Sequence, residues 1–235
     1  MTTPLELVVL DMAGTTVRDD GVVEQAFQRA AARTGVADRM PWEEALDYVR
    51  ATMGQSKIDV FTHLAAGDRA AAERAAAAFE DAYAEIAAAQ GVSEIPGAAD
   101  AIQGLKDAGL AVALTTGFAP VTRDVLLDGL GWRGLVDLAL SPADAGRGRP
   151  APDLVLTALI RTQTSRVSAV AVVGDTVSDV ESGRRAGAGF VAGVLSGAHD
   201  RPALSGAGAD VVLDDVSGLL AVLAERELLP VVAVS

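Results

Sequence analysis

The feature that most constrains this chain is a regular alternation of short apolar runs and longer helical stretches. The apolar runs cover residues 5–10, 110–115, 136–140, 168–173, 189–194 and 210–213. Helical stretches fill residues 97–108, 120–130, 152–162, 177–186 and 216–227. Strands that alternate with helices of this length predict βαβ units and a parallel sheet covered on both faces. We therefore expect an α/β protein with a Rossmann-like core.

One region breaks the alternation. Between residues 22 and 90 the sequence is rich in alanine and shows no strand pattern, and we expect helices at 22–34, 41–52, 56–66 and 68–89. A helical block inserted after the first strand predicts a cap packed over the strand ends. The expected division is a core domain of residues 1–18 and 95–235 and a cap domain of residues 19–94. The apolar tail, residues 230–235, receives no assignment.

Composition excludes several classes of protein. The chain has no cysteine, so disulfides, thiolate metal sites and a cysteine nucleophile are ruled out. A net charge of −13 argues against nucleic acid as a partner. The sequence has neither a long uncharged apolar run nor a signal-peptide pattern, so we expect a cytoplasmic protein with no membrane partner. An anionic substrate would need a locally positive site, while most acidic residues are expected on the surface.

The first candidate motif is Asp11-Met12-Ala13-Gly14-Thr15-Thr16, which follows the first apolar run. Ligands of open parallel sheets bind beyond the carboxyl ends of the strands. A carboxylate there can coordinate Mg²⁺ or attack phosphorus. The backbone of the following turn, with Gly14 allowing close approach, can hold phosphoryl oxygens. The alternative is that Asp11 only caps the turn.

The second candidate motif is Gly174-Asp175-Thr176-Val177-Ser178-Asp179. Asp175 follows a strand and is expected to share a metal ion with Asp11, because Mg²⁺ prefers carboxylate oxygens. Asp179 is expected to hold the metal ligands in position. The alternative is that Asp179 only contributes a favourable charge to the first turn of a helix.

Two weaker signals lie between these motifs. Thr116 and Gly117 end the second core strand and offer a hydroxyl and backbone N–H groups. Arg149 lies in a glycine-rich loop before a helix and could neutralise the nucleophile or a phosphoryl group. The alternative for Arg149 is a solvated surface residue, which is the expectation for Arg147.

Together, these motifs resemble those of the haloacid dehalogenase (HAD) superfamily of phosphohydrolases and span residues 7–187. The resemblance implies that Asp11 is the nucleophile, Thr116 the second-motif hydroxyl, Arg149 the cation and Asp175, with Asp179, the metal motif. It also implies Mg²⁺ held by Asp11, Ala13 and Asp175. Typical members have an acidic residue two positions after the nucleophile, where this chain has Ala13. Alanine cannot protonate a leaving group, a contribution worth about 10²–10⁴ in rate.

The phosphonatase branch, the phosphonoacetaldehyde hydrolases, resembles this chain more closely. Its D-x-A-G-T-T, G-D-T-V-S-D and M-G-x-x-K-I-D motifs match residues 11–16, 174–179 and 53–59. The resemblance implies that Lys57 forms a Schiff base with the substrate carbonyl, beside Met53, and that Ala13, Gly14, Thr15 and Gly117 bind the phosphonyl group. A surface position is the alternative for Lys57. Reactivity requires a neutral amine and thus a lowered pKa.

Two positions depart from that branch. Val60 replaces a histidine and Phe118 replaces a tyrosine, and both replaced residues are implied to transfer protons. His63, one helical turn beyond Val60, is either a substitute for that histidine or a surface residue.

The sequence therefore predicts a Mg²⁺-dependent hydrolase of a 2-oxoalkylphosphonate that uses Asp11 and Lys57. The alternative is a phosphomonoesterase that does not use Lys57. A non-catalytic phospho-acceptor or Mg²⁺-binding module is a third reading, which the long cap disfavours. A dehalogenase would not explain the Asp175–Asp179 pair. The partners expected are a small phosphonate or phosphate and, by resemblance only, a second copy of the chain bound through the cap.

Overall fold

The computed structural model describes residues 4–230 of the 235-residue chain. Its centre is a six-stranded sheet in the order β3-β2-β1-β4-β5-β6, and every neighbouring pair is parallel. The strands are β1 (Leu7–Asp11), β2 (Ala111–Thr115), β3 (Leu138–Leu140), β4 (Val170–Gly174), β5 (Phe190–Val194) and β6 (Val211–Leu213). The predicted Rossmann-like α/β fold is confirmed.

The sheet is buried on both faces because apolar side chains alternate between two cores. Along β1, Val8 and Leu10 belong to one apolar cluster, whereas Leu7 and Val9 belong to the other. The first cluster includes Ile102 and reaches the cap; the second is covered mainly by α8 and α9. The predicted continuous apolar runs are therefore fully buried strands.

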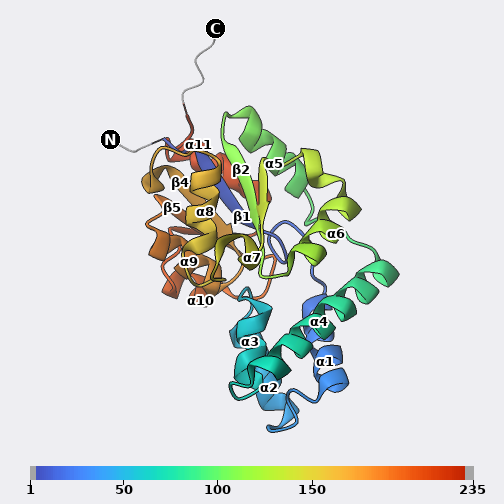
Figure 1. The fold of residues 1–235 in the computed structure, drawn as a ribbon. Coiled ribbons are helices and arrows are strands. Elements are labelled where there is room, and N and C mark those ends of the chain that lie inside the picture. The colour runs from blue at the N-terminus through green and yellow to red at the C-terminus, as the bar shows by residue number, and fades with distance from the viewer. Residues whose placement is uncertain (1–3, 231–235) are drawn as a thin grey trace.

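Helices cover the sheet on both sides (Figure 1). Those of the core are α5 (Ala98–Asp107), α6 (Pro120–Leu130), α7 (Pro142–Ala145), α8 (Asp153–Arg161), α9 (Val177–Ala186), α10 (Arg201–Gly206) and α11 (Leu219–Glu225). Short 3₁₀ helices lie at Trp132–Gly134, Val167–Ala169 and Val216–Gly218. The sequence pattern did not predict α7 or α10, which are too short to show a helical period.

Residues 22–90 form four helices: α1 (Val22–Thr34), α2 (Trp42–Ala51), α3 (Lys57–Leu64) and α4 (Arg69–Gln90). Figure 1 shows them gathered below the sheet, with α4 running beside α1 and α3. Their centre is an aromatic cluster in which the Phe27 ring lies 4.9 Å from that of Phe61 and 4.7 Å from that of Phe79. Aromatic packing of this kind binds short helices into one unit.

The chain enters and leaves the helical block through two adjacent segments. The amide of Arg18 donates to the carbonyl of Ser93 at 2.9 Å, and Val17 forms an antiparallel bridge with Glu94. We propose that this paired stem marks the boundary between a core domain, residues 1–18 and 95–235, and a cap domain, residues 19–94. The tail that received no assignment, residues 230–235, lies almost wholly outside the described residues, as do residues 1–3.

Within residues 4–230, no helix combines the length and the apolar character needed to span a bilayer.

Candidate active site

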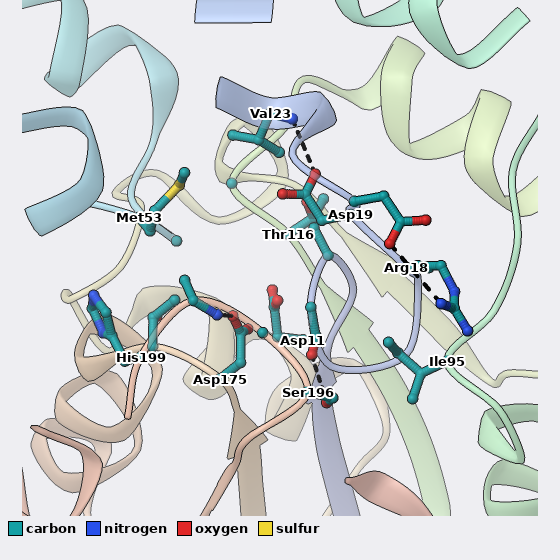
Figure 2. A pocket seen from close by; sticks show the side chains of 18 of the residues that line it. Asp11, Arg18, Asp19, Val23, Met53, Ile95, Thr116, Asp175, Ser196 and His199 are labelled. Atoms are coloured by element: carbon teal, nitrogen blue, oxygen red, sulfur yellow. Dashed lines mark hydrogen bonds and ion pairs between the residues drawn. The ribbon is translucent and has the colours of Figure 1, made fainter. Parts of the chain in front are cut away.

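The site forms where the three central strands end. Asp11 is the last residue of β1 and pairs in register with Thr115 of β2; on its other side lies β4, which Asp175 follows. Oxygens of Asp11, Asp175 and Asp179 lie within 4.8 Å of one another, and all three residues are buried. Figure 2 shows Asp11, Thr116 and Asp175 around one cavity. The fold therefore brings together motifs that are 164 residues apart in the chain.

Asp175 is held rigidly by the loops around it. Thr15 Oγ1 donates to its Oδ1 at 3.1 Å, and the amide of Ala198 donates to its Oδ2 at 2.8 Å. Burial and the neighbouring charge of Asp11 raise the pKa of Asp175. Gly14, with φ +86°, lies so close that an added Cβ would be 2.5 Å from the Asp175 carboxylate. The turn after β1 therefore needs glycine for both its conformation and its space.

Arg149 is the cation of this acidic cluster. It is 4 % exposed, and its Nη1 contacts Asp11 at 2.6 Å and also pairs with Asp179. Its Nε is buried and has no hydrogen-bond partner among residues 4–230. The surface alternative for Arg149 is wrong, whereas Arg147 is exposed and pairs with Asp153 at 2.8 Å, as expected.

The charge of the cluster suits a divalent cation. Three buried carboxylates face one guanidinium, and burial of excess negative charge is costly unless it is compensated. Asp11 and Asp175 offer the hard oxygens that divalent cations prefer, and Ala13, which also lines the cavity, can contribute only its backbone carbonyl. The residues present therefore fit a bound metal ion.

The Asp179 side chain is placed where it can hold neighbouring groups in position. It lies in the first turn of α9, where its Oδ2 accepts the backbone N–H of Thr176 at 3.1 Å in a capping box. The same carboxylate pairs with Arg149. The two readings of Asp179 are thus compatible, because one side chain caps the helix and also holds the Arg149 guanidinium beside Asp11.

Thr116 and Gly117 extend β2 into the cavity. Thr116 is buried, and its Oγ1 accepts the amide of Phe118 at 3.2 Å. A Cβ on Gly117 would lie 2.5 Å from the carbonyl oxygen of Gln55, which belongs to the cap. Glycine at this position therefore lets the cap contact the core closely.

Lys57 is the first residue of α3 and is 6 % exposed, so the surface alternative for it is wrong. Its Nζ lies 5.4 Å from the ring centroids of Phe27 and Phe79 and 5.1 Å from that of Phe118. The rings exclude water, and this burial lowers the pKa of Lys57 to about 8, although Glu80 acts in the opposite direction. The lowered pKa increases the fraction of the amine that is neutral near physiological pH.

The cap loop that precedes Lys57 lies directly against the core. Gly54 leaves room for Thr176, because an added Cβ would be 2.5 Å from the Thr176 hydroxyl oxygen. A Cβ on Gly148 would be 2.6 Å from the Cβ of Ser56. Met53 lines the same cavity as Asp11 (Figure 2), and Lys57 lines it too. These close contacts place the lysine opposite the carboxylates.

The cavity between cap and core has a volume of about 710 Å³. It is also lined by ionisable and polar residues that no sequence motif indicated, among them Asp19, Ser196 and His199. Lys57 lines a second cavity as well, of about 490 Å³, together with Glu80. These residues lie outside the motifs, so only their position in the fold identifies them.

The two positions that depart from the phosphonatase motifs are apolar and buried. Val60 is 1 % exposed, and Phe118 forms one wall of the lysine cage. His63 is exposed, stacks on Tyr48 at 3.8 Å between ring centroids and does not line either cavity. It is therefore a surface residue and not a substitute at position 60.

Comparisons with known proteins agree with this geometry. A family model described as haloacid dehalogenase-like hydrolase matches residues 5–187. A phosphonoacetaldehyde hydrolase from Syntrophobacter fumaroxidans is 33 % identical, over 79 % of this chain and 71 % of its own length. One from Bordetella pertussis is 30 % identical, over 82 % of this chain and 74 % of its own length.

Among solved structures, a phosphonoacetaldehyde hydrolase-like protein from Oleispira antarctica superposes with a TM-score of 0.82. The match covers 97 % of this chain and 95 % of that one at 23 % identity, so it bears on the fold alone.

Proposed function

Because this chain belongs to the haloacid dehalogenase-like hydrolases and has phosphonatase-like relatives, we propose that it cleaves the C–P bond of a 2-oxoalkylphosphonate, such as phosphonoacetaldehyde. The observation that carries the proposal is the buried Lys57 amine, which lines the same cavity as the Asp11 carboxylate. The amine is suited to attack carbon, and the carboxylate is suited to attack phosphorus. Hydrolysis of a phosphate ester would need only the carboxylate.

In the proposed reaction, Lys57 activates the carbon side of the substrate. Its neutral amine adds to the substrate carbonyl, loss of water gives an imine, and the imine nitrogen takes up a proton to become an iminium ion. The iminium draws the electron pair of the C–P bond, so carbon leaves as a neutral enamine and not as a carbanion. The lowered pKa of Lys57 favours the neutral amine that this step requires.

The phosphorus side belongs to the strand-end residues. Asp11 attacks phosphorus to give an aspartyl-phosphate, which water then hydrolyses. Arg149 lies against Asp11, and its buried Nε without a partner suits a phosphonyl oxygen. Thr116, Gly117 and the turn from Ala13 to Thr15 would bind the other oxygens, and Met53 would contact the carbon portion. Asp11, Asp175 and the carbonyl of Ala13 would hold Mg²⁺, which offsets the charge on phosphorus when bound.

The alternative function is hydrolysis of a small phosphate ester without a Schiff base. The observation in its favour is that Val60 and Phe118 carry no protons to transfer around an imine. Both functions require Asp11 and Asp175.

Phosphate release from phosphonoacetaldehyde and from a panel of phosphate esters separates the two functions. The proposal predicts that Lys57→Arg abolishes release from phosphonoacetaldehyde and that Asp11→Asn abolishes release from every substrate. Unchanged turnover of phosphonoacetaldehyde by Lys57→Arg would dismiss the imine. Turnover of esters alone by the unaltered enzyme would favour the alternative.

A further inference from the structure

Asp19 is a carboxylate that neither half of the proposed reaction uses. It lies in the segment that leads from the core to the cap, one residue beyond the paired stem at Arg18. Its Oδ1 accepts the amide of Val23 at 3.0 Å, in the first turn of α1. Its side chain lines the cavity together with that of Asp11 (Figure 2). Lys57 lines the same cavity. Asp19 is therefore fixed by the cap and exposed to the substrate space.

The other carboxylates at the centre of the cavity are committed to partners. Asp11 contacts Arg149, and Asp175 accepts hydrogen bonds from Thr15 and Ala198. Within residues 4–230, the bond from Val23 is the one side-chain hydrogen bond that Asp19 makes. Its second oxygen therefore remains able to carry and donate a proton.

The site needs such a donor. Ala13 cannot protonate a leaving group, and neither Val60 nor Phe118 can supply a proton. After C–P cleavage, the enamine carbon must gain a proton before the product can be released from Lys57. An ester oxygen that leaves as an alkoxide has the same need.

We propose that Asp19 donates the proton to the leaving group, in place of the side chain that position 13 lacks. For a phosphonate substrate, this role of Asp19 rests on the proposed function. The Asp19 O–H bond breaks as the C=C π pair of the enamine forms a C–H bond with the proton, and the lone pair of the Lys57 nitrogen forms the C=N bond of an iminium. Water then adds to the iminium carbon, the carbonyl product leaves, and the water supplies the proton that restores Asp19.

The electrostatic setting of Asp19 agrees with this role. Burial raises the pKa of Asp19, and the charges of Asp20 and Glu24 act in the same direction. The hydrogen bond from Val23 and the charge of Lys57 oppose the rise. A carboxyl group with a raised pKa retains its proton closer to neutral pH, as a general acid must.

Asp19→Asn tests the proposal because asparagine can still accept the amide of Val23 but cannot donate an acidic proton. Asp20→Asn is the matched control: it removes the same charge from the adjacent residue, whose side chain is 69 % exposed. Asp20 has φ +42°, a conformation that asparagine adopts readily. Each variant is assayed with p-nitrophenyl phosphate, whose leaving group needs no acid, with an alkyl phosphate and with phosphonoacetaldehyde.

We expect Asp19→Asn to slow alkyl phosphate hydrolysis by about 10²-fold or more, the usual contribution of a general acid, and to leave p-nitrophenyl phosphate hydrolysis nearly unchanged. With phosphonoacetaldehyde, it should release one equivalent of phosphate per site rapidly and the aldehyde slowly. Asp20→Asn should leave the ratio of the two ester hydrolysis rates close to that of the unaltered enzyme. Equal losses on both esters, or no loss on either, would overturn the proposal.

The ester comparison keeps this result separate from the proposed function. If the unaltered enzyme does not cleave phosphonoacetaldehyde, the phosphonatase function fails. The dependence of Asp19→Asn on the leaving group still decides whether Asp19 is the acid.

Discussion

At the scale of single residues, Lys57 is a cationic side chain whose burial costs free energy. It is enclosed by three phenylalanine rings, and burial lowers its pKa from 10.5 to about 8. The rings also attract an ammonium ion through their faces, which limits the fall in pKa. The cage therefore destabilises the charged amine, which increases the neutral fraction near neutral pH and lowers the stability of the fold.

The stability lost by burying the Lys57 ammonium can be measured. Below about pH 8 the folded protein holds a buried ammonium, whereas the unfolded chain holds the same charge in water. We expect Lys57→Met to raise the free energy of unfolding at pH 7 by on the order of 3 kcal/mol. The gain should shrink as pH rises from about 8 toward 10.5, because unfolding then also requires protonation of the released amine.

Urea unfolding at several pH values checks this prediction. The chain's other lysine, Lys106, provides the control, since it pairs with Asp137 at 3.1 Å near the surface. Lys106→Met should give no gain. A destabilised Lys57→Met at pH 7 would mean that the amine is well compensated and not poised for reaction.

The sequence predicted some of these residues and not others. Asp11, Asp175 and Lys57 lie in short motifs whose residue types suit one chemistry, so the sequence could indicate them. Phe27 and Phe79 belong to the apolar faces of two different helices, where nothing distinguishes a cage wall from an ordinary core residue. Asp19 and Glu80 are acidic residues in an acidic chain, and only their burial and their cavities separate them from the rest.

At the scale of elements, glycines determine how closely the cap approaches the core. Gly117 and Gly148 in core loops face Gln55 and Ser56 of the cap loop, with no space for a side chain. Neither glycine has a positive φ, so alanine is compatible with the backbone and only the contact forbids it. The same cap loop leads directly into Lys57.

We therefore expect Gly117→Ala to displace the cap loop and with it the lysine, while the strand-end residues stay in place. Turnover of a substrate that depends on Lys57 should fall by at least about 10²-fold, the order of loss expected for a displacement near 1 Å. Hydrolysis of p-nitrophenyl phosphate should change much less. Gly134→Ala is the control, because nothing lies within 4 Å of its Cβ position. Equal effects on both substrates would contradict this account of the glycine contact.

The same scale separates predictable elements from unpredictable ones. The six strands are short apolar runs with clear boundaries, and each was expected within a few residues of its observed place. Helix α7 has four residues and α10 has six, so neither completes the two turns that a helical period requires. The paired stem at Val17 and Glu94 was also not predicted, because its partners lie 77 residues apart.

At the scale of the whole molecule, the acidic cluster connects distant parts of the chain. Asp11 ends β1, Asp175 follows β4, and Arg149 reaches both Asp11 and Asp179 from a separate loop. A cation bound there would bind the folded state and not the unfolded chain, and so would stabilise the entire fold.

We expect Mg²⁺ to raise the melting temperature, by an amount that grows with Mg²⁺ concentration. Asp175→Asn should abolish the increase, because it removes one of the two carboxylates proposed to hold the ion. Removal of divalent cations with a chelator should abolish phosphate release, and added Mg²⁺ should restore it. The opposite finding, an equal increase with Asp175→Asn, would place the ion elsewhere. Differential scanning calorimetry makes the measurement.

The proposed reaction depends on Lys57 forming a covalent bond with the substrate carbonyl while Asp11 faces the same cavity. Its most direct test is borohydride reduction of the enzyme with phosphonoacetaldehyde, followed by intact-mass analysis and peptide mapping. The account predicts one adduct per chain, on Lys57 and absent from Lys57→Arg, with a yield that rises as pH approaches about 8. No adduct, or an adduct on Lys106 alone, would contradict it.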